Sequence, residues 1–213
     1  PTLPKVETMP TNPLSPYALQ KLVAEQYCQM FTALYGFETV TIRYFNVFGP
    51  RQDPGSPYSG VISLFATAAL EGRRPTIYGD GEQTRDFVFC EDLADGLVRA
   101  AEADGAGGEI FQLASGVETS LNRLLELLAE VSGAEPRIRR EPRGAGEILR
   151  NYSAVDKARD RLGYTPSVTL EQDLAELSDK FISNLPIAYF SPDGKVLASV
   201  GFDPASLVPI AGS

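Results

Sequence analysis

Tyr17 and Lys21 are the two side chains of this sequence whose types and spacing best suit acid–base chemistry. They lie four residues apart in a segment with helical periodicity, so they share one face of the expected helix. A phenol has a reference pKa of about 10, and a nearby ammonium group favours its ionised form. A tyrosinate beside a lysine can accept the proton of a substrate hydroxyl while a hydride leaves the same carbon. The Tyr-x-x-x-Lys spacing is common in long helices, so its weight depends on the surrounding sequence.

The helix expected to position this pair runs from Pro16 to Tyr35. Ser15 suits the N-cap and Pro16 the first helical position, and Gly36 is a natural C-terminal stop. These boundaries place Tyr17 in the first turn, where the helix dipole favours negative charge. Apolar residues recur along the segment at helical spacing: Leu19, Leu22, Val23, Tyr27, Met30, Phe31 and Leu34.

The composition excludes several classes of catalyst and partner. The 213 residues include no histidine, so Ser-His-Asp and Cys-His catalytic units and histidine-ligated metals are excluded. Cys28 and Cys90 are too far apart in sequence to form a metal-binding pair, and we expect reduced thiols in a cytoplasmic protein with no metal site. The net charge of −9 argues against nucleic acid as a partner. The longest apolar stretch is too short for a membrane span.

The rest of the sequence alternates between strand and helix patterns. Strands are expected at residues 39–45, 76–78, 86–89, 110–113 and 137–140. Helices are expected at residues 61–71, 91–103, 120–131, 155–162 and 170–181. Residues 46–60 are expected to form a Gly/Pro loop, and the leucines of 120–131 share one broad face. This alternation predicts an α/β protein with a largely parallel sheet.

Four motifs in a fixed order give Tyr17 and Lys21 a context. They read Ser-Pro-Tyr-Ala-Leu-Gln-Lys (15–21), Arg-Tyr-Phe-Asn-Val-Phe-Gly-Pro (43–50), Gly-Asp-Gly-Glu-Gln-Thr-Arg-Asp-Phe-Val (79–88) and Glu-Asp-Leu-Ala (91–94). Together they resemble the extended short-chain dehydrogenase/reductases, specifically the NAD-dependent epimerase/dehydratase family. The resemblance covers residues 1 to about 181 and is closest to the UDP-sugar 4-epimerases.

The resemblance implies an α/β fold that is the C-terminal part of an incomplete Rossmann-type, doubly wound fold, with a small mixed α/β substrate-binding region. Residues 1–60 would be the remnant of the NAD-binding domain and 61–181 the nucleotide-sugar-binding region. Residues 182–213 are an unassigned tail with a hairpin pattern. The glycine-rich loop that holds a dinucleotide pyrophosphate has no counterpart here. We therefore expect the isolated chain to be inactive, and to be unstable or self-associating because the strand at 39–45 lacks sheet neighbours.

The resemblance also implies an activity and a cofactor. The family's tyrosine is the catalytic base, and its lysine lowers the tyrosine pKa and holds the nicotinamide ribose; these roles carry over to Tyr17 and Lys21. Tyr44 would lie against the nicotinamide. The implied reaction is NAD-dependent 4-epimerisation of UDP-glucose and UDP-galactose, or their N-acetyl forms, in a homodimer. Two alternatives stay open: a nucleotide-sugar 4,6-dehydratase fragment, and an inactive fragment that only binds nucleotide sugar.

The nucleotide-sugar contacts carry over residue by residue. Asn46 and Arg85 would bind the diphosphate, and a planar guanidinium fork suits two phosphates. The strand from Thr76 to Tyr78 would hold uracil through backbone groups. Val61 is a further substrate-binding position in the resemblance.

Three more positions follow the family's Arg-x-Gly-acid pattern. Arg143 would reach phosphate, but one extra residue in this sequence makes Arg140 the alternative. Glu147 would accept hydrogen bonds from the uridine ribose. Asn151, four residues later, occupies a position that gates sugar size, and its small side chain predicts room for an N-acetyl group.

Overall fold

The computed structural model describes residues 2–50, 52, 60–70, 73–132, 138–143, 148–172 and 174. The predicted tail hairpin, most of the helix predicted at 170–181, and Glu147 lie outside the described residues. Residues 170–172 and 174 are helical, as expected for the start of that helix.

The described elements alternate between helix and strand, and most coincide with the predicted segments. The helices are α1 (Pro16–Tyr35), α2 (Val61–Leu70), α3 (Cys90–Glu102), α4 (Leu121–Ser132) and α5 (Asp156–Leu162). The strands are β1 (Thr41–Tyr44), β2 (Asn46–Phe48), β3 (Thr76–Tyr78), β4 (Thr84–Arg85), β5 (Phe87–Phe89), β6 (Ile110–Leu113), β7 (Thr119–Ser120) and β8 (Arg139–Glu141). The prediction of a loop from residue 46 is wrong at its start, because Asn46 to Phe48 pair with β5 as a strand. The short strands β4 and β7 were not predicted.

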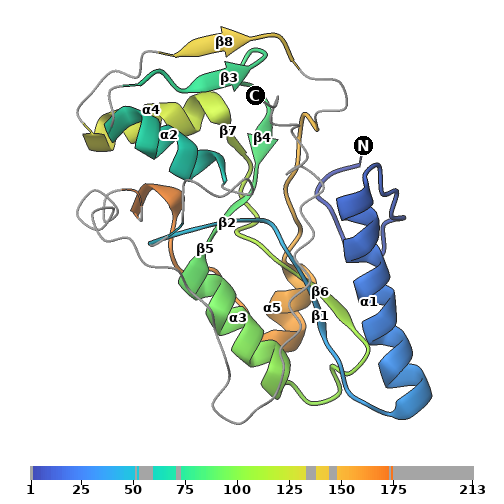
Figure 1. Ribbon diagram of the computed structural model, residues 1–213. Coiled ribbons are helices and arrows are strands. Elements are labelled where there is room, and N and C mark those ends of the chain that lie inside the picture. The colour runs from blue at the N-terminus through green and yellow to red at the C-terminus, as the bar shows by residue number, and fades with distance from the viewer. Residues whose placement is uncertain are drawn as a thin grey trace.

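The described strands form four two-stranded sheets, and consecutive strands of the chain belong to different sheets. β1 pairs with β6, β2 with β5 and β3 with β8, all in parallel, whereas β4 and β7 are antiparallel. The break between β1 and β2 falls at Phe45, and the break between β4 and β5 falls at Asp86. Parallel pairing with interspersed helices confirms the predicted α/β class (Figure 1). Among the described strands, β1 pairs with β6, so the expectation that this strand lacks sheet neighbours is wrong on that edge.

Two apolar clusters fill the space between the strands and helices. One lies around β1, β6, α3 and α5 and includes Ile42, Phe111, Leu113 and Tyr164. The other lies around α2, α4, β3 and β5, toward the opposite end of the molecule in Figure 1. The leucines of α4 contribute to this second cluster, which confirms the predicted apolar face of that helix.

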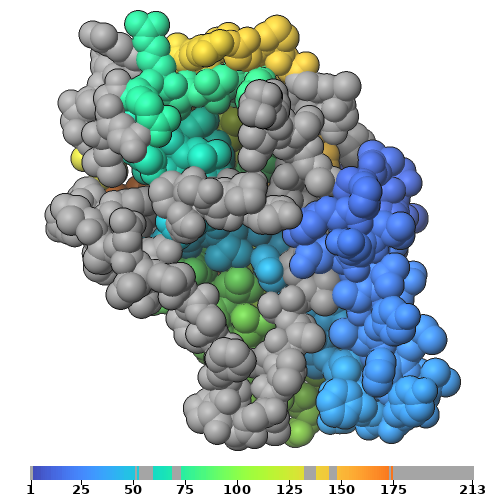
Figure 2. Space-filling view, viewed as in Figure 1, coloured from blue at the N-terminus to red at the C-terminus, as the bar shows by residue number. Residues whose placement is uncertain are grey.

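Helix α1 packs along β1 but turns most of its apolar residues to the surface. Ser15 caps the helix by accepting a hydrogen bond from the Ala18 N–H at 3.1 Å, and Gly36 ends it with a φ of 66°. The buried residues of α1 are Ala18 and Glu25. Six apolar residues, the α1 stripe, are exposed: Leu19, Val23, Tyr27, Met30, Phe31 and Leu34. In Figure 2 the helix, in blue, forms one side of the molecular surface.

Replacing Gly96 in α3 by alanine is expected to lower the free energy of unfolding by about 1–3 kcal/mol. The added Cβ would lie 2.6 Å from Leu113 Cδ1 and 3.0 Å from a ring carbon of Tyr164, and both side chains are fully buried. Urea unfolding measures the loss. The control is Gly107→Ala, whose Cβ would first meet the exposed Glu38 side chain, so its cost is expected to stay within about 0.5 kcal/mol. Equal losses in the two variants would contradict the packing argument.

Candidate active site

Tyr17 and Lys21 lie together at the N-terminal end of α1. Both are half-buried, and the Lys21 ammonium nitrogen lies 5.3 Å from the centroid of the Tyr17 ring. Tyr17 follows Pro16 in the first turn, at the positive dipole end of the helix. A cation and a helix N-terminus both stabilise a phenolate. This arrangement can therefore hold an ionised tyrosine ready to accept a proton.

The rotation of α1 about its axis is fixed by a buried ion pair between Glu25 and Arg43. Arg43 Nε and Nη2 each donate to one carboxylate oxygen of Glu25, both at 2.7 Å. Glu25 lies two helical turns after Tyr17, with Lys21 between them, so the three side chains share one face of α1. Because Arg43 is on β1, the pair turns the whole face toward that strand. The sequence reasoning missed this pair, although a lone arginine within the apolar strand was a usable signal.

The segment before α1 is tied to distant parts of the chain. Lys5 forms a parallel β-bridge with Ser153. The Lys5 N–H donates to the Tyr152 carbonyl at 2.9 Å, and the Lys5 carbonyl accepts from the Ala154 N–H at 2.9 Å. Glu7 accepts from the Gln112 N–H on β6 at 2.9 Å. The chain leading into Tyr17 is thus held by β6 and by the residues that follow Asn151.

The predicted diphosphate ligands Asn46 and Arg85 both lie next to Asp86: Arg85 precedes it in the chain, and Asn46 bonds to its carbonyl oxygen. The Asn46 backbone N–H and side-chain Nδ2 both donate to the Asp86 carbonyl oxygen, at 3.0 and 3.1 Å. Arg85 is buried, and its Nη1 donates to the carbonyl oxygens of Thr84 at 2.8 Å and Ile148 at 3.0 Å. The structure therefore brings together two site residues that lie far apart in sequence.

Asp86 itself carries a fully buried carboxylate that the sequence reasoning did not single out. Its Oδ1 accepts from Ser115 N at 2.8 Å and Ser115 Oγ at 2.6 Å, and its Oδ2 accepts from Gly116 N and Ser153 N, both at 3.1 Å. Burial raises the pKa of this carboxyl to about 6, while the hydrogen bonds from Ser115, Ser153 and Gly116 act in the opposite direction. At neutral pH the group is ionised and serves as an acceptor for four donors.

The contribution of Asp86 to stability is expected to fall as pH rises from about 4 to about 6. The folded-state pKa of about 6 lies above the model value of 3.8, so in this window the folded protein binds more protons than the unfolded chain. Stability carried by the protonated group is therefore present at low pH and lost as pH rises through the folded-state pKa. Urea unfolding of wild type and Asp86→Asn across this window measures the difference in free energy of unfolding, which should decrease with pH. A pH-independent difference would rule the titration out.

Among the described strands, β3, the strand predicted to hold a base, pairs with β8 on one edge only. β3 bonds to β8 through the Pro75 carbonyl and the Gly79 N–H, at 2.9 and 2.8 Å. Alternation along a parallel strand then directs the backbone groups of Thr76 and Tyr78 to the opposite edge. There the Tyr78 carbonyl accepts from Gln83 Nε2 at 2.7 Å.

The remaining predicted ligands fall in different surroundings. Val61 begins α2 and packs against the second apolar cluster. Asn151 is 1% exposed, so its side chain is enclosed by protein in this structure.

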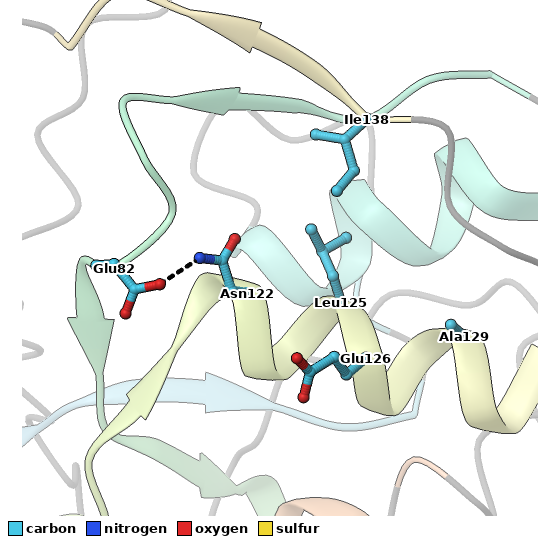
Figure 3. Close-up of a pocket in the computed structure, with 6 residues that line it drawn as sticks. All are labelled: Glu82, Asn122, Leu125, Glu126, Ala129 and Ile138. Carbon is cyan, nitrogen blue, oxygen red and sulfur yellow. Dashed lines mark hydrogen bonds between the residues drawn. The ribbon is translucent and has the colours of Figure 1, made fainter.

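Arg143 and Arg140 both reach the turn after β3. Arg143 Nη2 donates to Asp80 Oδ1 at 2.8 Å, and Arg140 donates to the Gly79 carbonyl at 3.3 Å and to Asn122 Oδ1 at 3.2 Å. A hollow of about 390 Å³ lies beside this turn, and Figure 3 shows its lining: Glu82, Asn122, Leu125, Glu126, Ala129 and Ile138. None of these six is a predicted site residue, so this hollow is not the candidate active site.

Metal-binding clusters and membrane-spanning helices are both absent from the described ranges. No group of three His, Cys, Asp or Glu side chains there could hold a metal ion, and Cys28 and Cys90 are free thiols. Of the helices the structure describes, none is both long and apolar enough to cross a membrane.

Comparisons with known proteins identify the family of this chain. The family model for the NAD dependent epimerase/dehydratase family matches residues 1–114. The UDP-glucose 4-epimerase of Mycolicibacterium smegmatis is 40% identical over 181 residues, covering 85% of this chain and 57% of the relative. The dTDP-glucose 4,6-dehydratase of Actinoplanes sp. is 33% identical over 171 residues, covering 80% of this chain and 52% of the relative.

Among solved structures, the UDP-N-acetylglucosamine 4-epimerase from Methanobrevibacter ruminantium, in complex with UDP-N-acetylmuramic acid, superposes with a TM-score of 0.80 at 37% identity. The match covers 85% of this chain and 58% of that structure. The fold is thus a partial Rossmann-like fold of the short-chain dehydrogenase/reductase type, and the chain spans a little over half the length of the curated relatives it matches. The chain belongs to the NAD-dependent epimerase/dehydratase family.

Proposed function

We propose that the protein containing this chain is an NAD-dependent nucleotide-sugar 4-epimerase acting on UDP-sugars. The observation that carries the proposal is the Lys21 ammonium at 5.3 Å from the Tyr17 ring, in the first turns of a capped helix. The similarity to a UDP-glucose 4-epimerase and to a UDP-N-acetylglucosamine 4-epimerase supports the choice of substrate class. The 4,6-dehydratase is the second candidate, because one of the reported relatives has that activity.

The residues present fit one end of the cofactor. When bound, NAD supplies the acceptor and donor of the hydride at the sugar C4. The Lys21 ammonium has three donors and the Tyr17 hydroxyl can donate or accept, which suits the hydroxyls of the nicotinamide ribose. Tyr44, half-buried on β1, would lie against the ring. No residue of this chain is assigned to the pyrophosphate.

In the proposed mechanism Tyr17 moves the proton and the other residues hold the nucleotide. The Tyr17 phenolate accepts the C4 hydroxyl proton and later returns it to the same oxygen, while Lys21 favours the ionised form of Tyr17. Arg85 and Asn46 would bind the diphosphate, and the edge of β3 opposite β8 would bind the base. Anchoring the nucleotide rather than the sugar leaves the sugar able to present either face, as inversion at C4 requires.

The test uses the natural full-length gene product that contains this chain, incubated with UDP-glucose and catalytic NAD. Formation of UDP-galactose, observed by NMR, is the expected result. UDP-N-acetylglucosamine in a parallel assay shows whether N-acetyl sugars are accepted, as the small Asn151 side chain predicts. A 4-keto-6-deoxy product would replace the proposal with the dehydratase, and UDP-sugar binding without turnover would replace it with a binding protein.

We also propose that the intact protein is a homodimer in which the α1 stripe is buried between subunits. Contiguous exposed apolar residues of this kind mark protein–protein contacts, and twofold pairing is the commonest arrangement of identical chains. Leu34→Asp, at a side chain that is 66% exposed, is expected to give monomers in sedimentation velocity. Val117→Asp, at a 60% exposed site outside the stripe, is the control and should stay dimeric. A dimeric Leu34→Asp protein would exclude this interface.

A further inference from the structure

We infer that Asp86 is a positioning residue of the proposed nucleotide-sugar site, holding the segments that carry Asn46, Arg85 and Asn151 in one arrangement. The inference rests on the proposed function, since it concerns how the diphosphate end of that site is built. Asp86 lies between β4 and β5, where one continuous stretch of chain leaves its antiparallel partner β7 and takes up its parallel partner β2. A single residue at this crossing can contact elements from both pairs.

The backbone carbonyl of Asp86 fixes Asn46. It accepts both the backbone N–H of Asn46 at 3.0 Å and the side-chain Nδ2 at 3.1 Å. The carboxamide of Asn46 therefore has a set orientation at the start of β2. Any shift of Asp86 would move this predicted diphosphate ligand with it.

The carboxylate of Asp86 fixes the segment from residue 148 to residue 153. Its Oδ2 accepts the Ser153 N–H at 3.1 Å, two residues after Asn151. The other end of the segment is held by Arg85, whose Nη1 donates to the Ile148 carbonyl at 3.0 Å. Two adjacent residues, Arg85 and Asp86, thus hold both ends of the segment that contains Asn151.

An amide cannot replace this carboxylate. Each Asp86 oxygen accepts two hydrogen bonds, from Ser115 N and Oγ on one side and from Gly116 N and Ser153 N on the other. Asparagine has one acceptor oxygen and one NH2 group, so at least one backbone N–H would face another donor. Asp86→Asn therefore preserves size and loses at least one of the four hydrogen bonds that hold residues 115–116 and the segment from residue 148 to residue 153.

Asp92 offers a matched control. It is also a buried carboxylate, in the first turn of α3. It accepts hydrogen bonds from Ser167 N at 3.0 Å, Ser167 Oγ at 2.7 Å and Val168 N at 3.2 Å. None of these three donors belongs to a segment with a predicted ligand. Asp92→Asn thus makes the same chemical change in a similar setting, away from the proposed site.

The experiment measures the dissociation constant of UDP for the NAD-loaded, full-length gene product by calorimetry, at a temperature where every variant is folded. Asp86→Asn is expected to weaken UDP binding by about tenfold, and Asp92→Asn by less than about twofold. Equal affinities in the two variants would overturn the role of Asp86 and leave the proposed function intact. Absence of UDP binding by the wild-type protein would instead overturn the proposed function.

A milder variant keeps the test decisive if Asp86→Asn does not fold. Ser115→Ala removes one donor to Asp86 Oδ1 and leaves the carboxylate in place. It is expected to weaken UDP binding by about threefold. An unchanged affinity in Ser115→Ala, with no folded Asp86→Asn, would overturn the inference.

Discussion

Tyr17→Phe is expected to lower kcat for epimerisation by about a thousandfold in the intact protein, with little change in UDP affinity. The substitution removes the phenol oxygen that would accept the C4 hydroxyl proton and keeps the ring beneath the Lys21 ammonium. The nucleotide contacts proposed for Arg85 and Asn46 are on other elements, so binding should persist. Steady-state kinetics with UDP-glucose, together with calorimetry of UDP, separates the two effects.

Tyr27→Phe is the control for this experiment. Tyr27 lies on the same helix, on the α1 stripe and away from the proposed nucleotide contacts. Tyr27→Phe keeps the apolar ring in place, so losing the hydroxyl should leave kcat unchanged. A Tyr17→Phe enzyme that retains wild-type kcat would remove Tyr17 as the base, and a general loss of UDP binding would show a disturbed fold.

Glu25→Gln is expected to lower the free energy of unfolding by about 3–5 kcal/mol. The side chains of Glu25 and Arg43 are 7% and 10% exposed, and the substitution leaves the buried guanidinium without a countercharge. It also replaces one of two acceptor oxygens by a donor, directly opposite an Arg43 N–H. Urea unfolding measures the loss.

Two comparisons separate charge burial from a general effect of the substitution. Glu126→Gln breaks an exposed pair with Arg123 on α4 and should cost less than about 1 kcal/mol. Replacing both members of the buried pair, in Glu25→Leu with Arg43→Met, should recover most of the stability. If Glu25→Gln lowers the free energy of unfolding by no more than Glu126→Gln does, the Glu25–Arg43 ion pair does not fix α1.

Elements set by local sequence were predicted well. The boundaries of α1 follow from Ser15, Pro16 and Gly36, which act within one turn of the helix ends. The strand at Ile110–Leu113 and the apolar face of α4 follow from short-range periodicity. Tyr17 and Lys21 were predicted to share a face because their spacing alone determines it.

Features set by distant partners were not predicted. Asn46 forms a strand because β5 pairs with it, and nothing in the Gly/Pro-rich sequence after it reveals that partner. Arg143 lies against Asp80, and this contact joins a residue that follows β8 to one that follows β3. Asp86 escaped notice because its four donors come from residues 115, 116 and 153. The division of the chain at residue 60 stays a prediction.

The ties between the start of the chain and its later parts set an order of events during synthesis. Glu7 can bond to Gln112 only after another 105 residues have been synthesised, which takes about 5–20 s at the speed of the ribosome. Once residue 44 has been added, α1 and β1 are complete, while β6, the strand partner of β1, has yet to be made. A nascent protein interrupted before residue 110 would therefore display the apolar side of α1 beside a β1 strand that lacks β6, and it would be a substrate for chaperones and proteases.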